Sequence, residues 1–65
     1  MDSAERYVNE KKVAEITGFS LAKLRNDRSL GRGIPYCKVG SAVRYPLSDV
    51  LEFMEAHRIH PRNAA

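Results

Sequence analysis

The chain has 65 residues, a net charge of +3 and a single cysteine, Cys37. A domain of this size buries only about 60% of the surface that its unfolded chain exposes, which excludes the walls of a deep catalytic cleft. Its apolar runs are far shorter than the roughly 20 residues of a membrane helix, its N-terminus is too polar for a secretory leader, and one cysteine without a partner is typical of a reducing cytosol.

The first predicted helix covers residues 10–17. Asn9 is a suitable N-cap, and Val8 and Val13 have the spacing of a hydrophobic staple across it. Gly18 supplies a residue that readily adopts the left-handed conformation closing many helices. We expect the inner side of this helix to carry Val13, Ala14, Ile16 and Thr17.

A second helix begins after only three residues, 18–20. Ser20 is its expected N-cap, and Phe19 and Leu24 repeat the staple. Two capped helices joined by a three-residue turn with glycine are typical of a helix-turn-helix, although an ordinary helical corner has the same pattern.

A helical wheel divides the second helix into two faces. Leu21 and Leu24 point inward, whereas Ala22, Lys23 and Asn26 lie on the opposite face, flanked by Arg25 and Asp27. Lysine can donate to guanine and asparagine can pair with adenine, so this outer face predicts base reading in a major groove by Ala22, Lys23 and Asn26. Arg28 falls nearer the inner side, where its stem can pack while the guanidinium reaches outward.

The basic charge is concentrated in the middle of the chain. Residues 21–44 contain six cationic side chains and one acid, for a net charge of +5, so the remaining residues sum to −2. Such a distribution indicates a surface for a polyanion, although a solvated basic segment without a partner has the same composition. The expected contacts to the DNA backbone come from Lys11, Lys12, Ser20, Arg25, Arg28 and Arg32.

The stretch 33–45 predicts a β-hairpin. Its arms contain β-branched and aromatic residues, namely Ile34, Tyr36, Val39, Val43 and Tyr45, and residues 40–41 are a plausible tight turn. A two-stranded hairpin beside a helix-turn-helix is a wing, and this wing offers a second contact to the duplex through Lys38, Ser41 and Arg44.

A third helix is expected from Asp49 to about His57, capped by Ser48. Val50, Leu51, Phe53 and Met54 supply its apolar surface. The predicted fold is therefore mainly α with a small β-hairpin, a winged helix-turn-helix in the order helix, turn, helix, two-stranded wing, helix. We expect one DNA-binding domain over residues 1–65, ordered from about 7 to 59, with frayed tails at 1–6 and 60–65.

These elements resemble the small excisionase and AlpA-type regulators of phages and prophages, which share a MerR-like winged helix-turn-helix. The resemblance runs through YVNEKKVAEITGFS and LRNDRSLGRGIPYCKVGSAVRYPLSDVLEFM, about residues 7–59. Its most specific positions are Leu24, Asn26, Arg28, Ser29, Gly31, Gly33, Pro35, Lys38, Gly40, Val43, Arg44, Tyr45, Ser48, Asp49 and Phe53.

The resemblance implies sequence-specific binding of double-stranded DNA in the bacterial or phage nucleoid. It places the second helix in the major groove and the wing turn at the neighbouring minor groove. Members act as transcription regulators or as directionality factors that bend DNA for recombination, so it implies tandem copies on DNA and an integrase as partners.

The chain departs from this family at Lys23, Asp27 and Ile34, where many relatives have threonine, an aromatic residue and proline. Lys23 lies on the presumed base-reading face, so the preferred DNA sequence does not transfer. An acid near phosphates is unfavourable unless it is paired, and we expect Asp27 to form an ion pair with Lys23 or Arg28 in preference to accepting from a cytosine.

Enzymatic and cofactor chemistry are not expected. Cys37 lies in a predicted strand with no base directed toward it, and a buried or half-buried structural cysteine is the better interpretation. With His57 and His60 it makes only three potential zinc ligands, one of them in a fraying tail, so no metal site is expected.

Two alternatives remain beside a free regulator. One is a DNA-anchoring domain of a larger assembly, such as the small subunit of a phage terminase; the absence of an oligomerisation segment after Ile59 favours the free regulator. The other is a protein-interaction module that presents Phe53 and Met54 of the third helix, which requires Phe53 to be exposed and not packed against Phe19 and Leu24.

Overall fold

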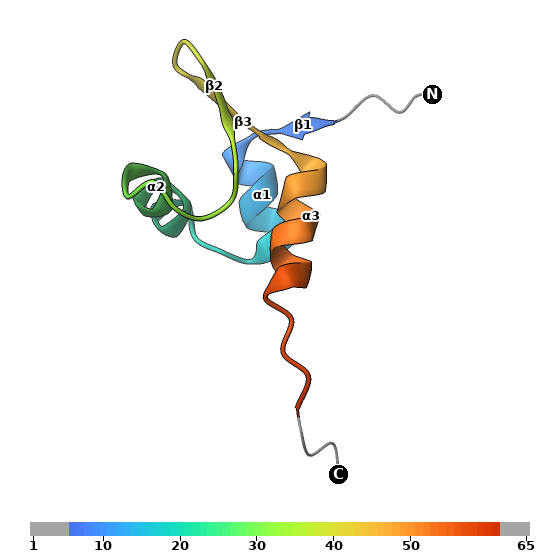
Figure 1. The fold of residues 1–65 in the computed structure, drawn as a ribbon. Helices are drawn as coiled ribbons and strands as arrows, with labels where there is room; N and C mark the ends of the chain where they lie inside the picture. Colours follow the sequence, from blue (N-terminus) through green and yellow to red (C-terminus); the bar gives the residue numbers. More distant parts are fainter. Residues whose placement is uncertain (1–5, 62–65) are drawn as a thin grey trace.

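The computed structural model describes residues 6–61, so most of both expected tails, 1–6 and 60–65, lies outside the described residues. This part of the chain folds into three helices and a small three-stranded antiparallel sheet (Figure 1). In chain order the elements are β1 (Tyr7–Val8), α1 (Glu10–Thr17), α2 (Leu21–Ser29), β2 (Cys37–Val39), β3 (Ala42–Pro46) and α3 (Leu47–Ala56).

The caps predicted for the first two helices are confirmed. The Asn9 side chain accepts a hydrogen bond from the Lys12 amide at 2.9 Å, and the Ser20 hydroxyl accepts one from the Lys23 amide at 3.0 Å. Gly18 closes α1 with a positive φ of 81°, a conformation that glycine adopts without a steric penalty. These local hydrogen bonds fix the short turn between α1 and α2.

The inner side of α1 is narrower than expected. Val13 is fully buried, but Ile16, predicted to face inward, is 38% exposed. An eight-residue helix of a small domain meets the core along one narrow line, and here that line runs through Val13 with Ala14 packed beside it. The prediction for Ile16 was therefore wrong.

The sheet has three strands where a two-stranded wing was expected. β3 lies in the centre, with β1 paired to its end (Tyr7↔Pro46, Val8↔Tyr45) and β2 paired along its start. A strand of two residues carries no periodic pattern, so β1 was not recognisable in the sequence. It anchors the N-terminal end of the fold to β3.

The first arm of the hairpin is shorter than predicted. Ile34 and Tyr36 precede β2, which begins only at Cys37, and the chain turns at Gly33 with a positive φ of 95°. Ile34 is nevertheless 5% exposed and belongs to the core. A β-branched residue can therefore be buried by a loop as well as by a strand, which is why the composition misplaced the start of the arm.

The third helix begins earlier than predicted, at Leu47, and Ser48 is not its N-cap. Pro46 occupies the cap position and makes no side-chain cap hydrogen bond. The Leu47 amide instead donates to the Arg6 carbonyl at 2.8 Å. A tertiary backbone contact thus satisfies one of the first amides of the helix, which have no partner within the helix, and the helix follows β3 directly.

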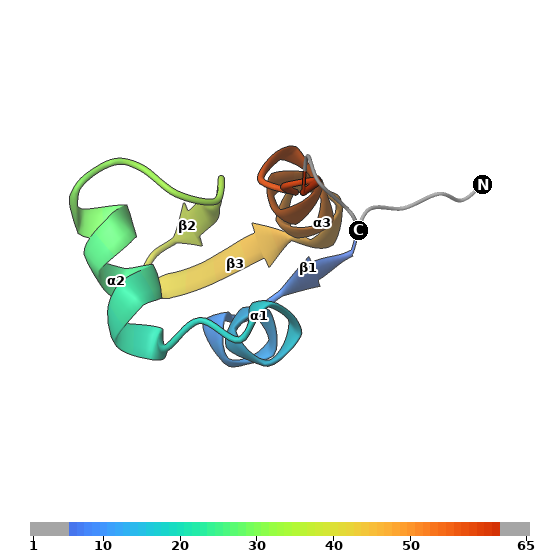
Figure 2. The same ribbon diagram turned by 90° about the horizontal axis from the view of Figure 1, so that it is seen from below.

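The core lies where the sheet meets the helices, and β3 runs between α1 and α3 with α2 across the hairpin side (Figure 2). Several half-buried residues pack against this core, among them Val8, Phe19, Leu21 and Phe53. Among residues 6–61, no helix is long and apolar enough to cross a membrane. The buried apolar side chains are Val13, Leu24, Ile34, Tyr45 and Val50.

Candidate nucleic-acid interface

The outer face of α2 is exposed and polar. Ala22, Lys23 and Asn26, predicted to read bases, all face solvent, while Leu24 on the opposite side is buried. Leu21 is half-buried, as expected for the inner side. The wheel therefore assigned the faces of the first two turns correctly, and these three side chains lie together on one surface.

Asp27 is an exception to the predicted faces, because it is buried at 9% exposure where it was expected to flank the outer surface. Its carboxylate accepts a hydrogen bond from Lys23 Nζ at 3.0 Å and another from Arg32 Nε at 3.3 Å. Of the two predicted ion-pair partners, Lys23 is confirmed, whereas Arg28 pairs with Glu10 and Arg32 is the second partner of Asp27. The hydrogen bond from Lys23, supported by that from Arg32, holds the pKa of Asp27 below its usual range in spite of burial.

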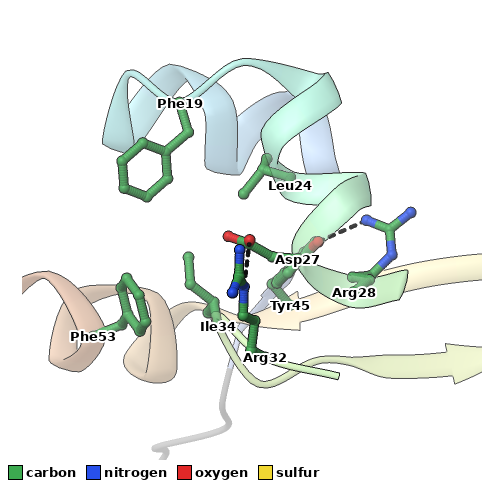
Figure 3. Close-up of a pocket in the computed structure, with 8 residues that line it drawn as sticks. All are labelled: Phe19, Leu24, Asp27, Arg28, Arg32, Ile34, Tyr45 and Phe53. Atoms are coloured by element: carbon green, nitrogen blue, oxygen red, sulfur yellow. Dashed lines mark hydrogen bonds and ion pairs between the residues drawn. The ribbon is translucent and has the colours of Figure 1, made fainter. Parts of the chain in front are cut away.

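Asp27 also joins α2 to the loop that precedes the hairpin (Figure 3). The Arg32 amide donates to the Asp27 carbonyl at 2.9 Å. Gly33 approaches so closely that a Cβ at its position would lie 2.9 Å from the Asp27 Cβ. The sequence signal for this contact was Gly33, where the backbone requires a glycine, but the sequence did not show that its partner is Asp27.

The ion pair limits what Lys23 can contact. Its ammonium is held by Asp27 and lies 5.1 Å from the centroid of the Phe19 ring, although the side chain is 49% exposed. Lys23 would therefore have to break its ion pair with Asp27 and leave the Phe19 ring before it could contact a base. Asn26 has no such competing partner among residues 6–61 and is the freer of the two predicted base-reading side chains.

Glu10 at the start of α1 holds two arginines of α2. Arg25 donates to it through Nε at 3.2 Å and through Nη2 at 2.6 Å, and Arg28 Nη1 donates at 3.3 Å. The hydrogen bonds from Arg25 lower the pKa of Glu10. Sequence reasoning missed Glu10, because α1 and α2 come together only in the tertiary structure.

Arg28 occupies the structural position that the wheel suggested. Its side chain is 19% exposed, and Nη1 also donates to the Tyr45 hydroxyl at 2.7 Å. This bond to Tyr45, ahead of that to Glu10, raises the pKa of Arg28. The Arg28 guanidinium thereby links α1, α2 and β3, and a phosphate contact from it would have to use its remaining donors.

Three of the predicted contact residues, Lys11, Lys38 and Arg44, form no ion pair within residues 6–61. The Arg44 side chain is exposed and donates to the Val43 carbonyl at 2.8 Å. By contrast, Lys12 pairs with Glu15 at 3.1 Å on the surface of α1. Of the predicted contact residues, those cations without an acid partner in residues 6–61 thus lie on the hairpin and at the start of α1.

The hairpin register separates its two cations. Lys38 lies opposite Val43, and Arg44 lies opposite Cys37, so the two cationic side chains start from opposite faces of the hairpin. One groove beside the hairpin is lined by Lys38 with residues of α2, and another is lined by Arg44 and Ser41 with Lys11. The sequence placed all three wing residues in one hairpin but did not show this division.

Cys37 is exposed, so the prediction of a buried or half-buried cysteine was wrong. It starts on the face of the hairpin that carries Arg44 and not on the face that carries Val43, which packs against the core. Within the described part of the chain, no three histidine, cysteine, aspartate or glutamate residues cluster as metal ligands would. The His57 ring instead contacts the Phe53 carbonyl at 2.8 Å at the end of α3.

Phe53 is half-buried and packs against the core. It lines the same small hollow as Phe19 and Leu24, toward which all three side chains point (Figure 3). Leu51 and Met54, at 53% and 37% exposure, are the large apolar side chains that α3 leaves on the surface. Phe53 is therefore not the exposed anchor that the interaction-module alternative required.

Comparisons with models of protein families, with curated proteins and with solved structures return no match. The resemblance to excisionase and AlpA-type regulators thus stays a prediction. The case for a function rests on the surface formed by α2 and the hairpin, which combines polar side chains at the start of α2 with cations on both sides of the hairpin.

Proposed function

We propose that this protein binds double-stranded DNA in a sequence-specific manner as a winged helix-turn-helix domain. In this proposal α2 enters the major groove, the hairpin formed by β2 and β3 is the wing, and α1 supports α2 against the sugar-phosphate backbone. The protein then acts as a transcription regulator or as an excisionase of phage or prophage type.

The observation that carries the proposal is the composition of the exposed face of α2. The face starts directly after the capped turn and presents only small or polar side chains, namely Ala22, Lys23, Arg25, Asn26 and Ser29. A recognition helix requires such side chains near its N-terminus, where they meet base edges.

The ion pairs refine the roles within this proposal. Asn26 is the primary base-reading residue, since a carboxamide can form two hydrogen bonds with adenine and no described residue competes for it. Ala22 permits close approach to a base edge or a thymine methyl group. Lys23 contributes a contact only after exchanging Asp27 for a base.

The backbone contacts then follow the cations that lack acid partners. Lys11 at the start of α1 and Arg44 on the hairpin line one groove, and Lys38 lines the other. Ser20, Lys12 and Arg32 are secondary contacts in this proposal. Lys12 and Arg32 already have acid partners, Glu15 and Asp27, which a phosphate must replace.

An alternative function is that of a DNA-anchoring domain in a larger assembly, such as a terminase small subunit. Such a domain would use the same surface. Tandem copies of the chain or an integrase are partners that the resemblance implies for a regulator or an excisionase. A single copy of this size offers a small interface with DNA, so binding to adjacent sites is the expected route to useful affinity.

The experiment that tests the proposal is a fluorescence-anisotropy titration of the protein with a pool of random duplex DNA at two salt concentrations, followed by sequencing of the retained duplexes. Enrichment of a short motif is the expected result. The Asn26→Ala substitution should lower affinity for the enriched duplex by about 1–3 kcal/mol and leave affinity for random duplex nearly unchanged.

The matched control is Arg58→Ala, because Arg58 lies beyond the end of α3 and pairs there with Glu55 at 2.7 Å. It should leave both affinities close to those of the wild type. Retention of no duplex at low salt, or equal losses on the enriched and random duplexes for Asn26→Ala, would contradict the proposed recognition by α2.

A further inference from the structure

The groove between α2 and β2 has a lining that differs from the rest of the surface. It contains three cationic side chains and an aromatic ring, and no acidic side chain contributes to it. Arg25 and Ser29 come from α2, and Lys38 comes from the hairpin. The lining residues are Arg25, Arg28, Ser29, Tyr36, Lys38 and Val43.

Arg28 is held in this groove with part of its hydrogen-bonding capacity unused. A guanidinium carries five N–H donors, and here Nη1 alone makes the bonds to Glu10 and Tyr45. Within residues 6–61 no hydrogen bond uses Nε or Nη2 of Arg28. No buried side-chain nitrogen or oxygen of these residues lacks a partner, so the unused donors reach solvent.

Two aromatic rings restrict the same guanidinium. Its Cζ lies 5.7 Å from the centroid of the Tyr36 ring and 6.0 Å from that of Tyr45, and the two rings are 6.0 Å apart. Together with the 2.7 Å bond to the Tyr45 hydroxyl, these contacts fix the orientation of Arg28 before any ligand arrives. A fixed donor loses little conformational entropy on binding.

Lys38 approaches the groove from the other side. The register places it on the hairpin face of Val43, which lines the same groove, and it has no acid partner among residues 6–61. An oriented guanidinium and a flexible ammonium across a groove suit an anion with several acceptor oxygens. Phosphate oxygens have this chemistry, whereas base edges offer a single acceptor pair to a guanidinium.

We propose that this groove binds one phosphodiester of the DNA backbone, shared between Arg28 and Lys38, with Tyr45 as the residue that positions Arg28. The inference rests on the proposed function and deepens it. It assigns Lys38 to the backbone beside α2, whereas the family resemblance directs the wing toward the minor groove. Arg44, on the other face of the hairpin, contacts a different part of the duplex.

The test uses the duplex enriched by the wild-type protein, prepared as a series with one uncharged methylphosphonate linkage at each position. Wild-type affinity should fall about five- to tenfold at the linkage that occupies the groove. For Lys38→Gln, the loss at this linkage should shrink to about twofold or less, because the variant has already lost the contact. For Arg44→Gln, the matched control, the loss at this linkage should stay as in the wild type.

Tyr45→Phe tests the positioning role, since it removes the hydroxyl that holds Arg28 and keeps the buried ring. A smaller loss at the same linkage, with losses elsewhere unchanged, supports positioning. A uniform drop at all linkages is the result of a merely structural role and would overturn the assignment of Tyr45. Circular dichroism before each titration identifies the folded fraction.

The outcomes separate this inference from the proposed function. If the wild-type protein enriches no motif from random duplex, both fail. If it enriches a motif but Lys38→Gln shows the full wild-type loss at every linkage, the groove holds no shared phosphate and only the inference fails. Lys38 is exposed and outside the core, so this variant should fold and keep the comparison decisive.

Discussion

Glu10 and Asp27 decide how much of the positive charge of α2 is free. Each carboxylate accepts hydrogen bonds from two cationic side chains, so the groups of three carry a net charge of only +1 each. The sequence shows a strongly basic middle segment with Asp27 as its one acid, and the fold brings Glu10 to two of its arginines from outside that segment. The cations concerned are Arg25 and Arg28 at Glu10, and Lys23 and Arg32 at Asp27.

Because of these two carboxylates, the free energy of unfolding should depend on pH in the acid range. Hydrogen bonds from Arg25 and from Lys23 lower the pKa values of Glu10 and Asp27 below their ordinary values of 4.5 and 3.8. A carboxylate with a lowered pKa stabilises the fold fully above its unfolded pKa, and this contribution is lost as the pH falls through the folded value. Urea unfolding should therefore show lower stability at pH 3 than at pH 7.

The Glu10→Gln variant should lose part of this pH dependence, because glutamine keeps a hydrogen-bond acceptor but cannot titrate. The matched control is Glu52→Gln on the exposed surface of α3, which should preserve the wild-type difference between the two pH values. An identical pH dependence in the wild type and in both variants would show that the ion pairs of Glu10 do not contribute.

At the scale of the elements, local hydrogen bonds define α1 and α2, and tertiary contacts define β1 and α3. Asn9, Gly18 and Ser20 close or open their helices through groups within four residues in the chain. The start of α3 depends on the Arg6 carbonyl instead, more than 40 residues away. Local signals are readable in a sequence, and distant ones are not.

The Ser20 cap gives a prediction at this scale. Ser20→Ala removes the acceptor for the Lys23 amide and should lower the free energy of unfolding by about 1 kcal/mol. Ser20→Asn, which restores an acceptor, should stay close to the wild type. Thermal or urea unfolding measures both, and equal losses for the two variants would contradict a capping role.

At the scale of the whole molecule, the fold places the hairpin between two grooves that differ in their cations. Lys38 lines one beside α2, and Arg44 and Lys11 line the other beside the start of α1. Arg28 lines both, held by Glu10 and Tyr45. Arg28 is thus shared by the two grooves, whereas each exposed cation lines only one of them.

The proposed binding to DNA has an expected salt dependence, which follows from this arrangement. Each neutralised phosphate contributes a slope of about −0.9 in log K against log salt concentration, so counting five or six basic residues of the surface gives about −5. Of the predicted contact residues, three cations have no acid partner in residues 6–61, namely Lys11, Lys38 and Arg44. A cation that must exchange an acid for a phosphate releases fewer counterions in total. We therefore expect a slope nearer −3.

Single substitutions check this expectation. Lys38→Gln and Arg44→Gln should each make the slope shallower by about 0.9, because each removes one of the proposed phosphate contacts. Arg58→Gln removes the same charge beyond the end of α3, outside the proposed DNA-binding surface, and should leave the slope unchanged. A common change in all three variants would indicate that net charge alone, and not these positions, sets the salt dependence.

The sequence by itself determined the elements whose signals are local. Caps, a left-handed glycine and apolar spacing predicted α1, α2 and their turn. The β-branched and aromatic residues about a tight turn at residues 40–41 predicted the hairpin, because each of these signals depends on groups that are neighbours in the chain. The exposed Ala22, Lys23 and Asn26 followed from the helical period. The sequence also predicted an ion pair for Asp27 but left its partner open between Lys23 and Arg28, and the structure has Lys23.

Only the tertiary structure decided which cations are free and which residues are buried. Glu10 meets Arg25 and Arg28 across two helices, Asp27 is buried beneath Gly33, and the third strand exists only because β3 offers an edge to residues 7–8. Cys37 is exposed because the strand register places it on the outer face. Such contacts join segments far apart in the chain, so no local pattern specifies them.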